Sequence, residues 1–215
     1  MPKRVSFFVP SGGACGTMKG WKRPFASSSL LPRPRRRRTP TTPRSPQTRA
    51  WRWCLNSWPK LIPMKLSVDQ KEFVELLNSK GVKYVLVGGH AVGFHGHPRY
   101  TGDIDFFVDV TAENARRLAE VFKEFGFGKL PFKTGELTVP QMVFQIGHPP
   151  NRIDVITSIS AVEFDEAWSS RVEIEVDGLR LWVIDKELLV RNKLASGRPH
   201  DLDDARKVQK RRRTG

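Results

Sequence analysis

Apolar residues recur along residues 67–208 with two different periods, and these periods predict both helices and strands. Helical spacing predicts helices over residues 68–80, 111–125, 160–168, 185–194 and 199–208, with a brief helix over 91–94. Short apolar or alternating runs predict strands over residues 84–87, 104–108, 141–146, 153–156, 171–176 and 179–184. This mixture predicts an α/β or α+β domain built around one sheet.

Local signals mark some of these boundaries. Ser67 is followed three residues later by Gln70, which is the pattern of a capping box at a helix start. Ser160 and Glu163 repeat that spacing before the apolar residues of the third helix. The Asp-Gly pair at residues 177–178 lies between two alternating runs and predicts a tight hairpin there.

The first 63 residues differ in composition from the rest of the chain. They hold 14 of the 37 Lys and Arg residues and no acid, whereas residues 64–215 hold the other 23 against all 22 acids. The net charge of +15 therefore belongs almost entirely to the first segment. That segment also has 10 of the 16 prolines and shows no useful periodicity. We expect it to be disordered, because it cannot bury enough apolar surface to offset its ordering entropy.

Three interpretations of this basic, Pro/Arg-rich segment compete. It is a nucleic-acid-binding arm, an organelle transit peptide, or upstream sequence translated from a start placed too early. We favour the third, in which the working protein begins at Met64 and residues 64–215 form the domain. Both cysteines, Cys15 and Cys54, fall in the first segment, so the domain is expected to have no disulfide framework and no thiolate zinc site.

No apolar run approaches the roughly 18 residues that a membrane span needs. No signal peptide is visible at the start of the chain. The sequence therefore favours a soluble cytoplasmic protein without a membrane partner.

Two aspartates mark the start of the strand over residues 104–108. Asp103 and Asp105 flank Ile104, so both carboxylates point to the same face of a strand. Like charges at this spacing repel unless a cation lies between them, and a divalent metal is the usual cation. The alternative is that one of the two aspartates faces solvent at the end of the sheet.

Asp154 is a single acid inside an apolar strand. A lone carboxylate there is costly unless it pairs with a cation or binds a metal. The alternatives to a metal site are an ion pair with Arg152 or a position at the edge of the sheet. If this strand lies beside the strand of Asp103 and Asp105, the three carboxylates converge.

A double glycine, Gly88-Gly89, separates the strand over residues 84–87 from the brief helix. It is either a plain turn or a turn whose backbone N–H groups hold phosphate, and its spacing does not fit a dinucleotide-binding fingerprint. Arg99 either neutralises phosphate or pairs with a local acid. The histidines nearby match no metal-ligand pattern, so surface or substrate-contact roles are favoured for them: His90, His95 and His97.

The order of these features resembles that of the DNA polymerase β-type nucleotidyltransferase superfamily. Gly88-Gly89, the Asp-x-Asp pair and a third acid on a later strand follow in the family's order. Small stand-alone members are the most similar, including the toxins of abortive-infection (type IV toxin–antitoxin) systems. Residues 99–105 match their Arg-x-Thr-x-Asp-x-Asp form, and three residues of the charged segment 193–204 match their C-terminal element by type: Lys193, Arg198 and Asp201.

The resemblance implies a mixed sheet with helices packed mainly on one face. It also implies transfer of a nucleoside monophosphate from a nucleoside triphosphate, such as ATP, to an acceptor hydroxyl, with release of pyrophosphate. The three aspartates would be catalytic and would hold two Mg²⁺ ions, with Mn²⁺ as the alternative. The acceptor would be RNA, including tRNA, or protein, and an antitoxin-like partner would accompany the chain. The residues expected to bind nucleotide are Gly88, Gly89, Arg99, Lys193, Arg198 and Asp201.

Two other functions remain open at this point. One is a degenerate module of the same fold that binds nucleotide or a partner protein without turnover. The other is a nucleic-acid-binding protein acting through its basic arm, whose removal would flatten the salt dependence of binding.

Overall fold

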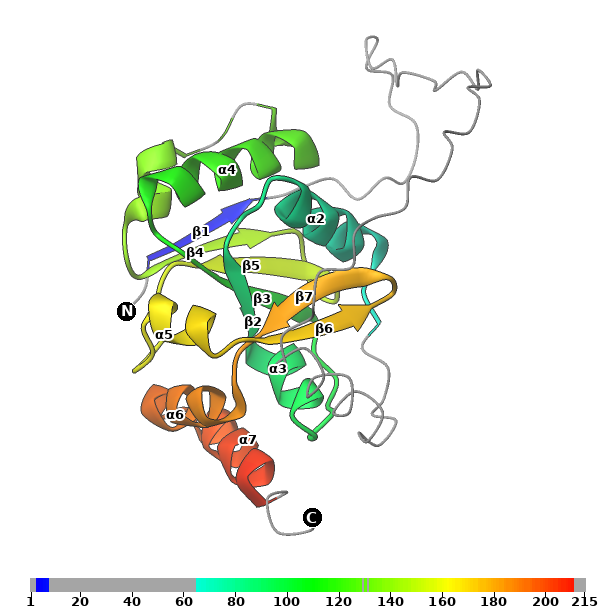
Figure 1. Ribbon diagram of the computed structural model, residues 1–215, viewed down its shortest axis with the longest axis vertical. Coiled ribbons are helices and arrows are strands. Elements are labelled where there is room, and N and C mark those ends of the chain that lie inside the picture. Colours follow the sequence, from blue (N-terminus) through cyan, green and yellow to red (C-terminus); the bar gives the residue numbers. More distant parts are fainter. Residues whose placement is uncertain (1–2, 8–64, 129, 131, 211–215) are drawn as a thin grey trace, which may run out of the picture. The chain divides into compact units, whose positions relative to one another are not determined.

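The computed structural model describes residues 3–7, 65–128, 130 and 132–210, which fold around a seven-stranded mixed sheet (Figure 1). The strand order is β1-β4-β5-β3-β2-β7-β6. The strands are β1 (Lys3–Phe7), β2 (Tyr84–Val87), β3 (Asp103–Val108), β4 (Met142–Ile146), β5 (Arg152–Ile156), β6 (Val172–Val176) and β7 (Leu179–Val183). The mixed sheet implied by the family resemblance is therefore confirmed.

The central strand β3 sets the geometry of the sheet. It pairs parallel with β5 and antiparallel with β2, and the register places Asp105 directly beside Asp154. Paired residues of parallel neighbours share a face, so these two carboxylates lie on the same side of the sheet. β4 runs antiparallel to β5, and β6 and β7 form the predicted hairpin.

The helices are α2 (Val68–Ser79), α3 (Gly88–Phe94), α4 (Ala112–Phe122), α5 (Phe164–Ser169), α6 (Lys186–Ser196) and α7 (Pro199–Lys210). Two short helical turns, η1 (Lys123–Phe127) and η2 (Thr134–Thr138), follow α4. α6 and α7 pack against each other, and α3 contacts α6. Figure 1 shows these three helices gathered away from α2 and α4, which lie together.

Aromatic side chains fill the space between the sheet and the pair α2 and α4. Phe73 of α2 lies against Phe106 of β3 and Phe122 of α4, with ring centroids 5.7 and 6.1 Å apart. Phe122 also contacts Phe144 of β4. Because side chains alternate along β3, Asp103 and Asp105 point to the face opposite this core. On that face Phe107 of β3 meets Phe164 of α5, with centroids 5.2 Å apart.

Several local predictions can be compared with the structure. Ser67 and Gln70 form the expected capping box of α2. The Ser160 prediction is wrong, because α5 begins after Glu163, whose side chain caps nothing. α3 begins at Gly88, three residues earlier than the brief helix predicted.

The expectation of disorder for residues 1–63 is wrong at residues 3–7. This short run pairs parallel with β4 at the edge of the sheet, from Lys3 beside Met142 to Phe7 beside Ile146. Its alternating polar and apolar residues suit an edge strand. The remainder of that segment, with its two cysteines, lies outside the described residues, as does Met64. Among the helices of the described residues, none combines the length and apolar character needed to cross a membrane.

Candidate functional site

Three carboxylates converge at one end of β3 and β5. Oxygen atoms of Asp103, Asp105 and Asp154 all lie within 4.8 Å of one another, so this carboxylate triad could hold a metal ion. Asp154 is buried, whereas Asp103 and Asp105 are partly exposed. The convergence follows from the parallel register, which sets Asp105 beside Asp154 and keeps Asp103 two residues away on the same face.

Arg152 is bound to two members of the triad. Its Nε donates to Asp154 Oδ1 at 2.7 Å, and its Nη2 donates to Asp154 Oδ2 at 3.0 Å and to Asp103 Oδ2 at 2.5 Å. Gln145 Nε2 also donates to Asp154 Oδ2 at 3.2 Å. The ion pair with Arg152 and the convergence of the carboxylates, which the sequence offered as alternatives, therefore occur together.

Asp105 has a strongly perturbed acidity. Burial, together with the negative charges of Asp103 and Asp154, raises the pKa of Asp105 from 3.8 to about 7, while Lys193 and Arg152 oppose the shift. Among the described residues, no group donates a hydrogen bond to its carboxylate. Asp105 thus carries negative charge that its surroundings compensate only in part.

Close contacts require both residues of the double glycine, Gly88 against Asp105 and Gly89 against Thr101. A Cβ at Gly88 would lie 1.9 Å from Asp105 Oδ2, and Gly88 has a φ of +66° that disfavours other residues. A Cβ at Gly89 would lie 2.7 Å from Thr101 Oγ1. Thr101 in turn donates to Asp103 Oδ1 at 2.8 Å. The structure therefore brings both predicted glycines to the triad.

A second charged group joins α6, α7 and the segment before β3. Lys193 Nζ donates to Asp201 Oδ1 at 2.5 Å and lies 3.5 Å from Asp204 Oδ2. Arg99 Nη2 donates to Asp204 Oδ2 at 3.2 Å. We call Arg99, Lys193, His200, Asp201 and Asp204 the α6–α7 charge cluster.

The aspartates of this cluster are buried and well satisfied. Ser196 Oγ donates to Asp201 Oδ2 at 2.7 Å. Burial alone would raise the pKa of Asp201, but the hydrogen bonds from Lys193 and Ser196 outweigh it and hold the pKa below its ordinary value. The two carboxylates are thus matched by two permanent cations, Lys193 and Arg99.

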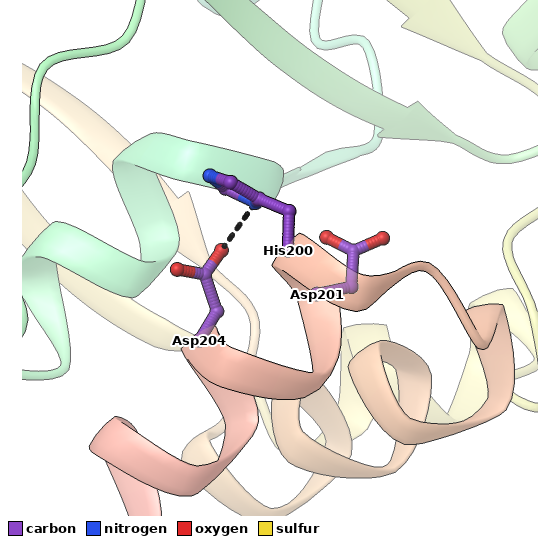
Figure 2. A group of neighbouring side chains, drawn as sticks. All are labelled: His200, Asp201 and Asp204. Carbon is purple, nitrogen blue, oxygen red and sulfur yellow. Dashed lines mark ion pairs between the residues drawn. The ribbon is translucent and has the colours of Figure 1, made fainter.

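His200, Asp201 and Asp204 also lie close enough together to form a metal-binding group (Figure 2). Figure 2 shows the ion-pair contact from His200 Nδ1 to Asp204 Oδ2, which spans 3.5 Å. A metal ion here would compete with the Lys193 and Arg99 contacts. The charge balance therefore favours a structural role for this group.

The three histidines have different environments. His95 is buried, and its Nε2 lies 2.7 Å from the carbonyl oxygen of Ile184, so the expectation of a surface or substrate-contact role is wrong for His95. Burial lowers the pKa of His90, an effect that nearby Asp103 opposes and nearby Arg99 reinforces. His90 thus lies beside the triad, and His97 is partly exposed.

The remaining predicted residues lie at different distances from the triad. Lys193 is close enough to Asp105 to lower its pKa. Arg99 and Asp201 lie in the α6–α7 charge cluster, and the acid that Arg99 binds is not local. Arg198 is exposed, and its charge acts on Asp201.

Sequence reasoning missed three contributors, and it offered Arg152 only as an ion-pair partner of Asp154. Thr101, like Arg152, precedes a triad aspartate by two residues, so strand alternation could have placed both on the same face. Asp204 pairs with Arg99 across 105 residues, and Gln145 reaches Asp154 from a neighbouring strand. No local pattern marks either of these two contacts.

Comparisons with known proteins give one family. Residues 65–211 match the model of a family described as nucleotidyltransferase of unknown function (DUF6036). Among solved structures, a candidate nucleotidyltransferase from Thermotoga maritima is similar with 19% sequence identity and a TM-score of 0.44, over 66% of this chain and 90% of that one. An antigenic nucleotidyltransferase-like protein from Paracoccidioides brasiliensis is similar with 18% identity and a TM-score of 0.42, over 67% of this chain and 76% of that one. No curated protein matches the sequence.

Proposed function

The chain belongs to this nucleotidyltransferase family of unknown function, and on that premise we propose that it transfers a nucleoside monophosphate from a nucleoside triphosphate to an acceptor hydroxyl, releasing pyrophosphate. One observation carries the proposal: three carboxylates meet beside a double glycine, and one of them, Asp105, occupies the space that a side chain at Gly88 would need. The family model spans both the triad and the α6–α7 charge cluster.

The triad suits a hard divalent cation. Its donors are all carboxylate oxygens, which Mg²⁺ and Mn²⁺ prefer, and the raised pKa of Asp105 reports uncompensated negative charge. We propose that Asp103, Asp105 and Asp154 hold two Mg²⁺ ions, or Mn²⁺ in their place. Such ions supply charge neutralisation at the phosphate and lower the pKa of an attacking hydroxyl.

The protein's own groups would divide the remaining tasks. Asp105, which accepts no hydrogen bond from the described residues, is the carboxylate most open to a ligand. Asp154 would take the proton of the acceptor hydroxyl at a carboxylate oxygen, in competition with its Arg152 contacts. Backbone N–H groups of Gly88 and Gly89 would bind phosphate, because the two residues lie beside the triad and carry no side chains of their own.

Basic residues in and near the α6–α7 charge cluster would bind or neutralise the phosphates of the nucleotide. Lys193 would neutralise charge on the departing pyrophosphate, and its buried contact with Asp201 would position it. Arg198 is exposed and free to move toward phosphate. Arg99 would bind phosphate only by exchanging its contact with Asp204.

The test is Asp105→Asn. We expect turnover to fall by at least about 10²-fold, which corresponds to roughly 2.7 kcal/mol in the barrier. The assay incubates the protein with each labelled nucleoside triphosphate, Mg²⁺ and total cell RNA and protein, and the destination of the label identifies the acceptor class. Asp165→Asn, at an exposed aspartate of α5, is the matched control. Near-wild-type turnover in Asp105→Asn would remove Asp105 from the site.

A second candidate is a non-catalytic module that binds nucleotide. The observation in its favour is Asp154, both of whose oxygens already accept hydrogen bonds from Arg152. Calorimetry with Mg²⁺ and each nucleoside triphosphate separates the two functions. A catalyst releases pyrophosphate once the acceptor is supplied, whereas the module binds nucleotide and releases none.

A further inference from the structure

Arg152 links two members of the carboxylate triad. Its guanidinium spans both oxygens of Asp154 and one oxygen of Asp103, at 2.5 to 3.0 Å. The Asp154 side chain is 7% exposed and that of Arg152 is 25% exposed. A bidentate guanidinium–carboxylate contact in such surroundings is a strong one, because charge and geometry match and solvent competes little.

A divalent cation bound by the triad would need the same oxygens. Mg²⁺ takes its ligands at about 2.0–2.1 Å, and a guanidinium hydrogen-bonded to those oxygens lies in the space that such an ion would fill. The two positive charges would also repel each other at this separation. Because Arg152 Nη2 donates to both Asp103 Oδ2 and Asp154 Oδ2, Arg152 competes with any ion that these two carboxylates would hold jointly.

We propose that Arg152 is a built-in competitor of the metal ion at Asp154, and that its guanidinium must leave this carboxylate for the ion to be bound by all three aspartates. The inference rests on the proposed function for its metal site. The strand itself has no need to move, because the Arg152 backbone N–H donates to the carbonyl oxygen of Gly102 and only the side chain has to rotate. Its partial exposure leaves a path toward solvent.

The consequence is a metal affinity set by Arg152. The full chain can be titrated with Mn²⁺ alone, following free Mn²⁺ by electron paramagnetic resonance. Arg152→Gln should bind Mn²⁺ at least about tenfold more tightly than the wild type, which is about 1.4 kcal/mol. Arg180→Gln is the matched control, since Arg180 is an exposed arginine on β7, and its Kd should stay within about twofold of the wild type.

Arg152→Lys separates direct occupancy from simple charge repulsion. Lysine keeps the positive charge but lacks the planar fork that covers both oxygens of Asp154. Direct competition therefore predicts tighter Mn²⁺ binding for Arg152→Lys than for the wild type, by about threefold or more. Repulsion alone predicts an unchanged Kd, which would overturn the proposal even if Arg152→Gln does not fold.

Thermal unfolding in EDTA gives a readout that does not depend on turnover. Arg152→Gln should melt below Arg180→Gln, because the carboxylates lose their counter-ion, and Mn²⁺ should restore most of the loss. Asp105→Asn tests the metal site itself. If Asp105→Asn abolishes Mn²⁺ binding while neither Arg152 variant tightens it, the site stands and the role given to Arg152 is wrong. Unchanged Mn²⁺ binding in Asp105→Asn would instead contradict the proposed function.

Discussion

Replacing Asp105 by asparagine should stabilise the folded protein at neutral pH, although the same change should abolish turnover. Burial and two neighbouring carboxylates raise the pKa of Asp105 to about 7, against 3.8 for the ordinary group. Asparagine has nearly the same shape and carries no charge. The substitution therefore removes a repulsion that the wild type tolerates at its site.

The sign follows from proton linkage. Between pH 3.8 and about 7 the folded protein binds more protons at Asp105 than the unfolded chain does, so the free energy of unfolding falls as the pH rises. Each pKa unit corresponds to about 1.36 kcal/mol. Asp105 therefore lowers the free energy of unfolding by about 4 kcal/mol above pH 7 and by roughly 1.6 kcal/mol at pH 5. The advantage of Asp105→Asn should thus grow by about 2–3 kcal/mol between pH 5 and pH 8.

Urea unfolding of both proteins in EDTA, at several pH values from 5 to 8, measures this difference. In thermal unfolding each kcal/mol corresponds to about 2–4 °C for a chain of this size. Added Mg²⁺ should raise the melting temperature of the wild type and leave that of Asp105→Asn nearly unchanged. The reasoning would be refuted if the difference in unfolding free energy between Asp105→Asn and the wild type does not grow with pH, or if Asp105→Asn is the less stable protein at pH 8. Asp165→Asn again serves as the control.

Three further perturbations test other parts of the structure. In urea unfolding, Gly88→Ala should lower the free energy of unfolding by at least about 2 kcal/mol and Gly178→Ala by about 1 kcal/mol, because both glycines have positive φ but only Gly88 faces a carboxylate. Equal losses would contradict the close approach of Gly88 to Asp105. Lys193→Met should lower the free energy of unfolding by about 3–5 kcal/mol, because buried carboxylates lose their counter-ion, whereas Lys207→Met on the surface of α7 should lower it by under about 0.5 kcal/mol. Similar losses would mean that Lys193 does not stabilise the α6–α7 charge cluster. A chain that begins at Met64 lacks the edge strand β1 but keeps the triad strands β3 and β5, so it should remain folded by circular dichroism and keep its Mn²⁺ affinity; loss of either would show that the domain needs the residues before Met64.

The convergence of the triad was predictable because it depends on local rules. Alternation along a strand puts Asp103 and Asp105 on one face, and a buried carboxylate such as Asp154 has to find a partner. The one assumption was that the two strands are neighbours, and the parallel pairing of β3 with β5 supplies that contact. The hairpin of β6 and β7 was predictable for the same reason, since its turn residues are adjacent in sequence.

The contacts that the sequence did not reveal join distant segments. Asp204 has no signal of its own, because its importance comes from Arg99, which is 105 residues earlier in the chain, and from Lys193 one helix earlier. The strand at residues 3–7 was missed because its polar and apolar residues alternate only from Arg4 to Phe7, within a basic, Pro/Arg-rich segment, and its partner β4 lies more than 130 residues away. Tertiary pairing of this kind overrides local composition.

Charge balance distinguishes the two groups that could hold a metal by geometry alone. In the α6–α7 charge cluster, two carboxylates face two permanent cations, so a divalent ion would leave a surplus of positive charge unless it expelled one of them. In the carboxylate triad, three carboxylates pair with one guanidinium, so negative charge remains that divalent ions can neutralise. The pKa of Asp105 is raised because negative charge in the triad is only partly compensated. The pKa of Asp201 is lowered because Lys193 and Ser196 compensate its charge in the α6–α7 charge cluster. The same comparison assigns different roles to the two basic residues: Lys193 completes a balanced group and stays in place, whereas Arg152 substitutes in part for a stronger cation and can be displaced by it.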